Sequence, residues 1–459
     1  MIHALPDLLR AVLGFVLAVG VLVTFHEAGH FVAARCFGVH VLRFSIGFGR
    51  PLWCRTSRRG TEWVIATIPL GGYVKLLDER EGPVPSALGQ ATLNRRPVWQ
   101  RLLIVLAGPA ANAILAVLLC WLMFMVGTQG LAPRLGTVAP DSPAARAGLR
   151  QGDEIIAVGH VSTRTWGQVT LALLWQALRR EEAELAVRAA GPMAPERQVS
   201  LPLEMQRIED GGQGLLAHLG LQPALPAIPP VVGQVMRQGP ASGILQPGDR
   251  IVALDGQPIR SWEELAELVR HKGSAMADVA YERQGTLHRD RIRIGQRVEA
   301  GRAFGFLGLA AAPPSAAAMA AYVVRDRRAP LPALLASWDW TVVMGGATAV
   351  LLAKTVEGQA SAHQIGGPVT IAVSAGQSLS GGPGAFLQFM ALLSLSLALL
   401  NVLPIPMLDG GHALFYVIEG IKGSPLSDRA HLIAQQVGML VLLALLALAL
   451  YNDLSRLFS

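Results

Sequence analysis

The sequence predicts a polytopic α-helical membrane protein with four transmembrane helices and two α+β domains inserted between the second and third of them. The composition is 52% hydrophobic and only 15% charged, which is too apolar for an ordinary soluble protein. Apolar stretches long enough to cross a bilayer stand on both sides of a longer, more polar segment, which carries a repeated strand-rich pattern.

The predicted spans are stretches with little or no charge, because charged side chains are costly in the hydrocarbon core of a bilayer. Only Arg10 and a His-Glu-His group interrupt the apolar run from Leu8 to Ala34. A second uncharged stretch, Gln364–Leu408, is broken by "AGQSLSGGPGA", so the third span is placed after that break. We expect spans at residues 1–34, 102–128, 385–409 and 431–453, joined by loops at residues 35–101 and 410–430.

Residues 313–384 are predicted to be a linker that contains an amphipathic segment, Leu331–Val356. Its two tryptophans, Trp338 and Trp340, suit a position at the outer membrane interface, and packing against the inserted domains is the alternative. A fifth span is a further alternative, because Thr341–Ala353 is uncharged. That run is short, however, and an extra span would invert the side on which the later acidic residue Asp409 lies.

Basic residues predict the orientation of the spans. The segment 35–101 holds eleven basic and four acidic residues, a net charge of +7 that equals the net charge of the whole chain. Lys and Arg close to spans mark the cytoplasmic side. This places residues 35–101 in the cytoplasm and puts both ends and the large insert outside. The excess charge is thus an orientation signal and does not indicate a nucleic-acid partner.

The insert contains an internal repeat. The motif "GTVAPDSPAARAGLRQGDEIIAV" has a counterpart in "GQVMRQGPASGILQPGDRIVAL", and in each copy a Trp stands thirteen positions after the Asp of a Gly-Asp turn. A proline-rich linker, Gln222–Pro230, divides the copies, so we expect domains at residues 129–224 and 225–312. Both copies resemble PDZ domains of the permuted bacterial type. That resemblance implies capture of an extended peptide along a strand edge, and a role as spacer or size filter is the alternative.

The first predicted span carries the motif His-Glu-x-x-His as His26, Glu27 and His30. On a helix this spacing places both imidazoles on one face, where they can bind one Zn²⁺. The Glu between them can take a proton from water that zinc activates. A chance match, a proton relay and a metal-transport site are alternatives, so a third ligand is needed to favour catalysis.

Asp409 is the candidate for the third ligand. It is the only acidic residue between Gln364 and Ala413, and the four-span topology places it on the same side as the two histidines. Two His and one carboxylate leave a fourth position open, which is typical of catalytic zinc. Pro404 and Pro406 favour an extended backbone just before it. Asp409 as a simple turn residue and His412 as a rival ligand are the alternatives.

These motifs together resemble the site-2 protease family of intramembrane zinc metalloproteases, and in particular its bacterial regulator-of-sigma-E protease branch. The resemblance covers essentially the whole chain and rests on motifs that occur in the same order: "HEAGH", "FSIGFG", "PLGGYVKLLDEREG", "AGPAANAIL" and "NVLPIPMLDGGHALF". It implies zinc binding by His26, His30 and Asp409, with Glu27 as the base.

The resemblance also implies substrate contacts and partners. Asn401 would hold unwound substrate backbone, and Gly71, Gly72 and Tyr73 would belong to a membrane-associated β element beside the active site. Ser396 stands where the branch often has a second Asn. The implied substrates are single-span proteins of the anti-sigma-factor type, already trimmed outside, and remnant signal peptides. The implied location is the bacterial inner membrane, with the PDZ-like domains in the periplasm and the active site towards the cytoplasm.

Two other function classes remain open from the residues alone. A non-catalytic PDZ receptor with a structural metal site would not need Glu27. A divalent-metal transporter would need ligands spread over several spans, whereas the candidates here converge at one place. A Glu27→Gln variant that binds substrate without cutting it would exclude the receptor.

Overall fold

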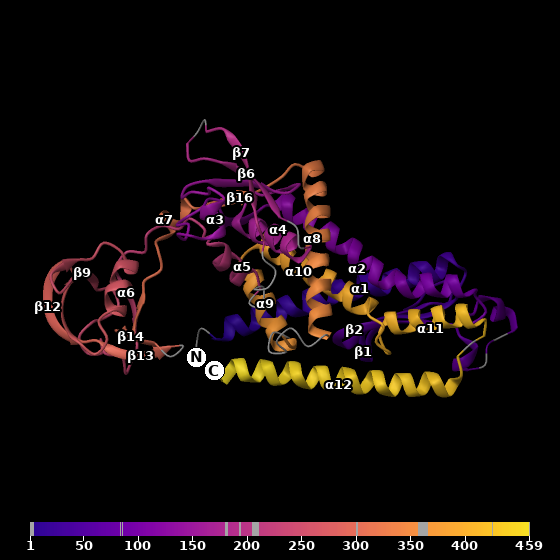
Figure 1. Ribbon diagram of the computed structural model, residues 1–459. Coiled ribbons are helices and arrows are strands. Elements are labelled where there is room, and N and C mark those ends of the chain that lie inside the picture. The colour runs from indigo at the N-terminus through magenta and orange to yellow at the C-terminus, as the bar shows by residue number, and fades with distance from the viewer. Residues whose placement is uncertain are drawn as a thin grey trace.

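The computed structural model describes residues 4–82, 84, 86–179, 182–191, 194–203, 211–299, 302–356, 366–424 and 426–458. The chain consists of long apolar helices, one small β element and two β-rich domains between α2 and α8 (Figure 1). The helical part contains α1 (Ala4–Cys36), α2 (Val98–Val126), α8 (Pro330–Val356), α9 (Pro368–Ser380), α10 (Pro383–Val402), α11 (Asp409–Lys422) and α12 (Asp428–Phe458).

Five of the described helices, α1, α2, α8, α10 and α12, are long and apolar enough to cross a membrane. Four of them correspond to the predicted spans, and the fifth, α8, covers the segment for which a fifth span was the alternative. In Figure 1, α8 stands across the direction that α1, α2 and α12 share.

The predicted third span and the loop after it differ from the structure in their bounds. The span was predicted to reach residue 409, but α10 ends at Val402, and Pro404 and Pro406 follow. Residues 410–430 were predicted to be a loop, yet most of them form α11, which begins at Asp409. Prolines cannot continue a helix in this position, so they separate α10 from α11.

The helix core joins α1, α2, α8 and α10. Ser394 of α10 donates its hydroxyl to the carbonyl oxygen of Asn112 on α2 at 2.8 Å, which fixes these two helices against each other. The buried apolar residues of this core include Ala18, Leu22, Leu115, Leu119, Ala333, Phe386 and Met390.

The C-terminal helix α12 is attached to the start of α9. Asp453 of α12 is only 2% exposed and accepts hydrogen bonds from the backbone N–H groups of Gly367 (3.0 Å) and Val369 (2.9 Å). Gly367 is the N-cap of α9, where N–H groups lack partners within the helix. The carboxylate therefore caps α9 and holds the end of α12 beside it.

The β element lies between α1 and α2 and is built from β1 (Val41–Thr56) and β2 (Glu62–Leu76). Both strands bend back on themselves. Residues 43–46 of β1 pair on one side with residues 62–65 and on the other with residues 72–75. Residues 72–76 thus form an edge of this small sheet. Two short 3₁₀ helices, Glu79–Glu81 and Ser86–Ala91, lead from it to α2.

The repeated segments fold alike. The first copy forms a sheet in the order β5-β4-β6-β7 and the second a sheet in the order β10-β9-β11-β12. The first domain contains α3 (Pro143–Arg146), β4 (Glu154–Val158), β5 (Val161–Ser162), α4 (Trp166–Arg179), β6 (Ala183–Arg188), β7 (Glu196–Leu201) and α5 (Gly211–Leu219). The second contains β8 (Val232–Val235), β9 (Arg250–Leu254), β10 (Gln257–Pro258), α6 (Trp262–Arg270), β11 (Met276–Arg283), β12 (Thr286–Arg293), β13 (Gly295–Glu299), β14 (Arg302–Phe306) and β15 (Leu309–Ala311).

The Gly-Asp turns of the two copies are stabilised in the same way. Asp153 accepts a hydrogen bond from the backbone N–H of Arg150 and pairs with Arg197 at 2.6 Å. Asp249 accepts from the backbone N–H of Gln246 and pairs with Arg283 at 2.8 Å. The repeated Asp thus has a structural role in both domains.

The insert enters and leaves the helical part at one place. β3 (Thr128–Leu131) follows α2 directly, and β16 (Val323–Asp326) precedes α8, with the short α7 (Ala316–Ala320) before it. β3 and β16 pair with each other antiparallel. Figure 1 shows the second domain at the far left, away from α1 and α2, whereas the first domain lies beside α8.

Candidate active site

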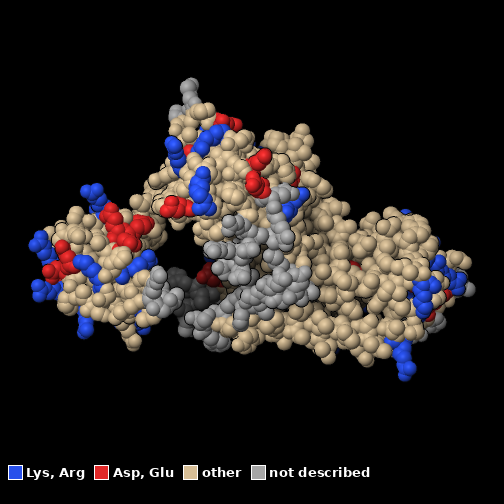
Figure 2. Space-filling view, in the orientation of Figure 1, with Lys and Arg blue, Asp and Glu red and all other residues tan. Residues whose placement is uncertain are grey.

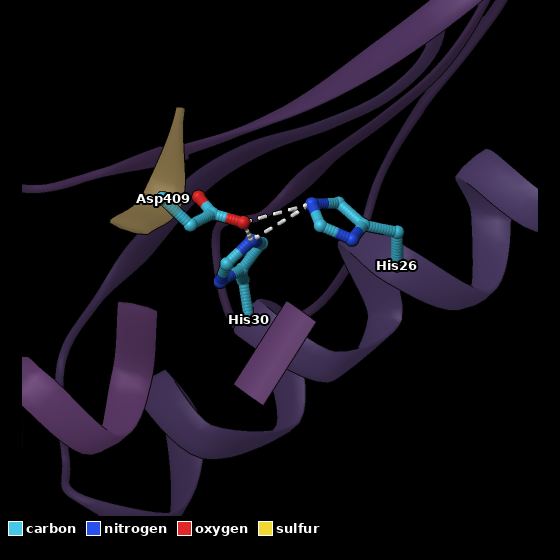
Figure 3. A group of neighbouring side chains, drawn as sticks. All are labelled: His26, His30 and Asp409. Carbon is cyan, nitrogen blue, oxygen red and sulfur yellow. Dashed lines mark hydrogen bonds and ion pairs between the residues drawn. The ribbon is translucent and has the colours of Figure 1, made fainter. Parts of the chain in front are cut away.

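His26 and His30 lie on one face of α1 and point towards Asp409 (Figure 3). The Nε2 atoms of the two histidines are 3.3 Å apart. Oδ2 of Asp409 lies 3.1 Å from Nε2 of His26 and 3.4 Å from Nε2 of His30. Residues separated by almost the whole chain therefore form one compact group.

The spacing of these three atoms fits a tetrahedral zinc ion. Zinc–ligand distances of about 2.0–2.1 Å in a tetrahedron place neighbouring ligand atoms about 3.3 Å apart. Among the described residues, this is the one group of three His, Cys, Asp or Glu side chains arranged to hold a metal ion. Oδ2 of Asp409 is buried and has no hydrogen-bond donor. A cation bound to all three atoms would satisfy it.

The other ring nitrogens of the histidines face residues of α2. Nδ1 of His30 is 2.8 Å from the carbonyl oxygen of Ile104, so this nitrogen carries the proton and Nε2 is left with its lone pair. Nδ1 of His26 is 3.3 Å from Nδ2 of Asn112, while Oδ1 of the same amide is buried without a partner. Rotating that amide by a half turn would let Oδ1 accept a hydrogen bond from the Nδ1–H group of His26.

Glycines allow α1 and α2 to approach closely at this site. A Cβ atom on Gly108 would lie 2.3 Å from Nε2 of His30, and a Cβ atom on Gly29 would lie 2.2 Å from the carbonyl oxygen of Ala107. Neither distance is compatible with a side chain. Both glycines are therefore required for the histidines to face α2 as they do.

Glu27 is 9% exposed and follows His26 directly, so it lies beside the group of three. A Cβ atom on Gly72 would meet Cγ of Glu27 at 3.1 Å, which places the edge strand of the β element against this carboxylate. Glu27 can therefore exchange protons with a molecule held between the histidines and the sheet edge.

Asp409 is positioned by the start of α11. A Cβ atom on Gly410 would lie 2.2 Å from the carbonyl oxygen of Leu403, so the chain turns tightly back on the end of α10. Farther along α11, Glu419 forms a bidentate ion pair with Arg101 of α2. Nη2 of Arg101 donates to Oε1 of Glu419 at 2.6 Å, and Nη1 donates to Oε2 at 3.0 Å. This pair holds α11 against the helix that also carries Gly108.

The structure places the remaining predicted site residues as follows. Gly72 lies beside Glu27, and Gly71 packs against the ring of Phe48. Tyr73 accepts a hydrogen bond from Arg43 at 3.2 Å. The other predicted or rival residues are Asn401, which is in the last turn of α10, and His412, which lies outside the group of three ligands.

The structure brings three residues without a predicted site role to the site or its support: Asn112, Gly108 and Arg101. An amide in an apolar span is a signal that could have drawn attention to Asn112, because polar groups within spans are usually functional. Which face of α2 these residues occupy is not encoded by any short motif.

Comparison with known proteins identifies the family. The model of peptidase family M50 matches residues 14–445, which is most of the chain. The chain belongs to peptidase family M50. This M50 protease is 40% identical to "Regulator of sigma-E protease RseP" of Escherichia coli (strain K12) over 444 residues, covering 96% of this chain and 98% of that relative. It is 39% identical to a "Putative zinc metalloprotease" of Xylella fastidiosa over 448 residues, covering 98% and 99%.

A solved PDZ domain of the SdrC-like protein from Listeria monocytogenes is also similar to part of this M50 protease. The likeness covers 20% of this chain and 92% of that domain, with 19% identity and a TM-score of 0.17. Membership of family M50 and the names of the relatives make the chain a membrane-embedded zinc metalloprotease.

Proposed function

We propose that this M50 protease hydrolyses a peptide bond inside the transmembrane segment of single-span proteins, with zinc held by His26, His30 and Asp409. The observation that carries the proposal is the set of three ligand atoms, 3.1–3.4 Å apart, with Glu27 beside them. A bound zinc ion would supply a Lewis acid that polarises the scissile carbonyl and lowers the pKa of water.

Glu27 acts as the general base and then as the general acid. Its carboxylate takes a proton from the attacking water while the water oxygen bonds to the carbonyl carbon. It then donates this proton to the leaving amine nitrogen as the C–N bond breaks. The Ile104 carbonyl keeps the proton of His30 on Nδ1, so Nε2 stays available as a ligand.

The edge formed by residues 72–76 supplies the backbone partners that an unwound substrate needs. Unpaired N–H and C=O groups cost several kcal/mol each in lipid. These residues pair with β1 on one side, and Gly72 brings the edge next to Glu27. A substrate strand added beside Gly71, Gly72 and Tyr73, with help from Asn401, would present its carbonyl to the site.

The proposed substrates are anti-sigma factors trimmed outside the membrane, and remnant signal peptides as a second class. The name of the Escherichia coli relative, a regulator of sigma-E protease, supports the first class. In Figure 2, Lys and Arg side chains lie at the right end of the molecule, where α11 is, and also over the domains at the left and top, where Asp and Glu accompany them. We place that end in the cytoplasm of the inner membrane and the PDZ-like domains, as peptide-binding filters, in the periplasm.

The proposal is tested by cleavage of a tagged single-span stub by the wild-type chain and by Glu27→Gln in parallel. Glu263→Gln, an exposed change on α6, is the matched control. We expect cutting by wild type and control, sensitivity to zinc chelation, and substrate binding without cutting by Glu27→Gln. Cutting by all three proteins would reject Glu27 as the base. Binding without cutting by all three would favour the receptor function.

A further inference from the structure

A cavity of about 480 Å³ lies between the last turn of α1 and the turn that joins β1 to β2. It is separate from the group of three ligands and has no part in the proposed hydrolysis. Its lining combines basic, hydroxyl and apolar side chains and contains no acid. The lining residues are Phe31, Val32, Arg35, Cys36, Ser57, Arg58, Arg59, Thr61 and Trp63.

The basic side chains of this cavity are available to bind an anion. Arg58 and Arg59 are exposed, and within the part of the chain that the structure describes neither has a hydrogen-bond or ion-pair partner. Arg35 is oriented by a hydrogen bond to Oγ1 of Thr61 and lies over the ring of Phe31 at 5.6 Å. Three guanidinium groups without a counter-charge create a positive potential in the cavity.

The turn that carries Arg58 and Arg59 is held in place. The backbone N–H of Ser57 donates to the carbonyl oxygen of Thr61 at 2.8 Å, and the N–H of Thr61 donates to the hydroxyl of Ser57 at 3.2 Å. The hydroxyl of Thr61 in turn donates to the carbonyl oxygen of Val41. Little backbone freedom would be lost when an anion binds here.

The apolar wall of the cavity continues along α1. The ring of Phe31 packs against that of Trp63 at 5.2 Å between centroids. Val32 is 57% exposed, and Phe25, two helical turns earlier on the same face, is 44% exposed. An acyl chain could follow this face into the membrane while its headgroup stays at the end of the helix.

We propose that this cavity binds the phosphate of an anionic phospholipid, with its acyl chains along the Phe25–Val32 face of α1. The phosphate oxygens accept hydrogen bonds from Arg58 and Arg59, which suit phosphate through their planar, multiple donors. The excess of basic residues in the segment 35–101 is the charge pattern expected beside an anionic leaflet. A free phosphate would share the headgroup chemistry but not the contacts along α1.

The test measures phospholipid binding to the full-length chain in detergent by native mass spectrometry. The probes are phosphatidylglycerol, phosphatidylcholine and inorganic phosphate. The variant is Arg58→Gln with Arg59→Gln, and the control is Arg50→Gln with Arg55→Gln, which removes the same charge from exposed positions of the same β element. We expect phosphatidylglycerol to bind in preference to phosphatidylcholine, and about tenfold weaker binding in the Arg58/Arg59 variant alone.

Each outcome decides between named alternatives. An equal loss of phosphatidylglycerol binding in both double variants would overturn the proposed site, because general surface charge would then explain the binding. Binding of inorganic phosphate as strong as that of the lipid would retain an anion site and reject the lipid. A thermal unfolding curve for each variant, recorded without lipid, shows whether the protein is folded.

Discussion

At the scale of single residues, Gly108 leaves room for the rings of His26 and His30. A Cβ atom there would lie 2.3 Å from Nε2 of His30 and 2.8 Å from Cε1 of His26. We expect Gly108→Ala to displace both rings, lower the zinc content and reduce cleavage on the order of 100-fold, because small misplacements of catalytic groups have large effects. Metal analysis by mass spectrometry and cleavage of the stub check this. Gly20→Ala on α1, where a Cβ would meet nothing within 4 Å, is the control.

Asn112 is a second residue whose role the geometry specifies. Its Oδ1 is buried without a partner, and its amide faces Nδ1 of His26. We expect Asn112→Ala to weaken zinc binding by about 10- to 100-fold, because partners of ligating histidines fix the tautomer and ring orientation. Asn112→Asp keeps an acceptor and should restore most of the affinity in a zinc-chelator competition. Equal affinity of wild type and Asn112→Ala would refute this role.

At the scale of elements, the ion pair between Arg101 and Glu419 joins α2 to α11. The two side chains are 7% and 16% exposed, and Arg101 also lies over the ring of Tyr416. We expect Arg101→Met to destabilise this contact by about 3 kcal/mol or more, because Glu419 would stay partly buried without a partner. Activity should fall as Asp409 moves with α11.

Two variants separate this effect from general damage. Arg101→Glu combined with Glu419→Arg restores opposite charges and should recover part of the stability and activity. Arg188→Met breaks an exposed pair with Glu196 in the first β-rich domain and should cost at most about 1 kcal/mol. Thermal unfolding and stub cleavage are the measurements. Equal stability and activity of Arg101→Met and Arg188→Met would show that the ion pair between Arg101 and Glu419 is dispensable.

The second β-rich domain should lose stability in acid. Burial favours a raised pKa for Asp249, but the hydrogen bonds from Arg283 and from the backbone N–H of Gln246 outweigh it and hold the pKa below its usual range. The folded domain therefore binds fewer protons than the unfolded chain. The contribution of Asp249 to the stability of the folded domain is complete above about pH 4, the ordinary pKa of Asp. It is lost as the pH falls through the lower pKa that Asp249 has in the folded domain.

This pH dependence can be measured in the full chain. Hydrogen exchange of the β9 amides should accelerate as the pH approaches the folded pKa of Asp249, after correction for intrinsic exchange. Asp249→Asn should exchange faster at pH 7 and show a flatter dependence on pH. Asp278→Asn, which removes an exposed carboxylate of β11, should leave the profile unchanged. An unchanged profile in Asp249→Asn would contradict the prediction.

At the scale of the whole molecule, the proposed orientation can be checked with thiols that the chain already has. Cys36 and Cys54 are exposed near the basic end, and Cys120 is buried in α2. A membrane-impermeant thiol reagent applied from the periplasm should not label the native chain, but it should label Gln257→Cys in the second domain. Inverted membrane vesicles should reverse this result. Labelling of Cys54 from the periplasm would show that the orientation is the reverse of the proposed one.

The sequence predicts the local parts of this molecule better than the contacts between distant parts. His26 and His30 are one helical turn apart, so their common face follows from spacing alone. Asp409 could be added because it is an isolated acid in an apolar region. The contacts of Asn112, Gly108 and Arg101 depend on the rotation of α2 against α1 and α11, which side-chain packing determines and no motif records. The same holds for the direction of α8.

The pairing of β3 with β16 brings the two ends of the insert together between α2 and α8. The spacing of α2 and α8 is therefore independent of how many residues the insert contains. The second domain lies away from α1 and α2, so it could be lost or exchanged without breaking this two-strand joint. The insert and the helical part can consequently evolve, and can be engineered, as separate modules of one chain.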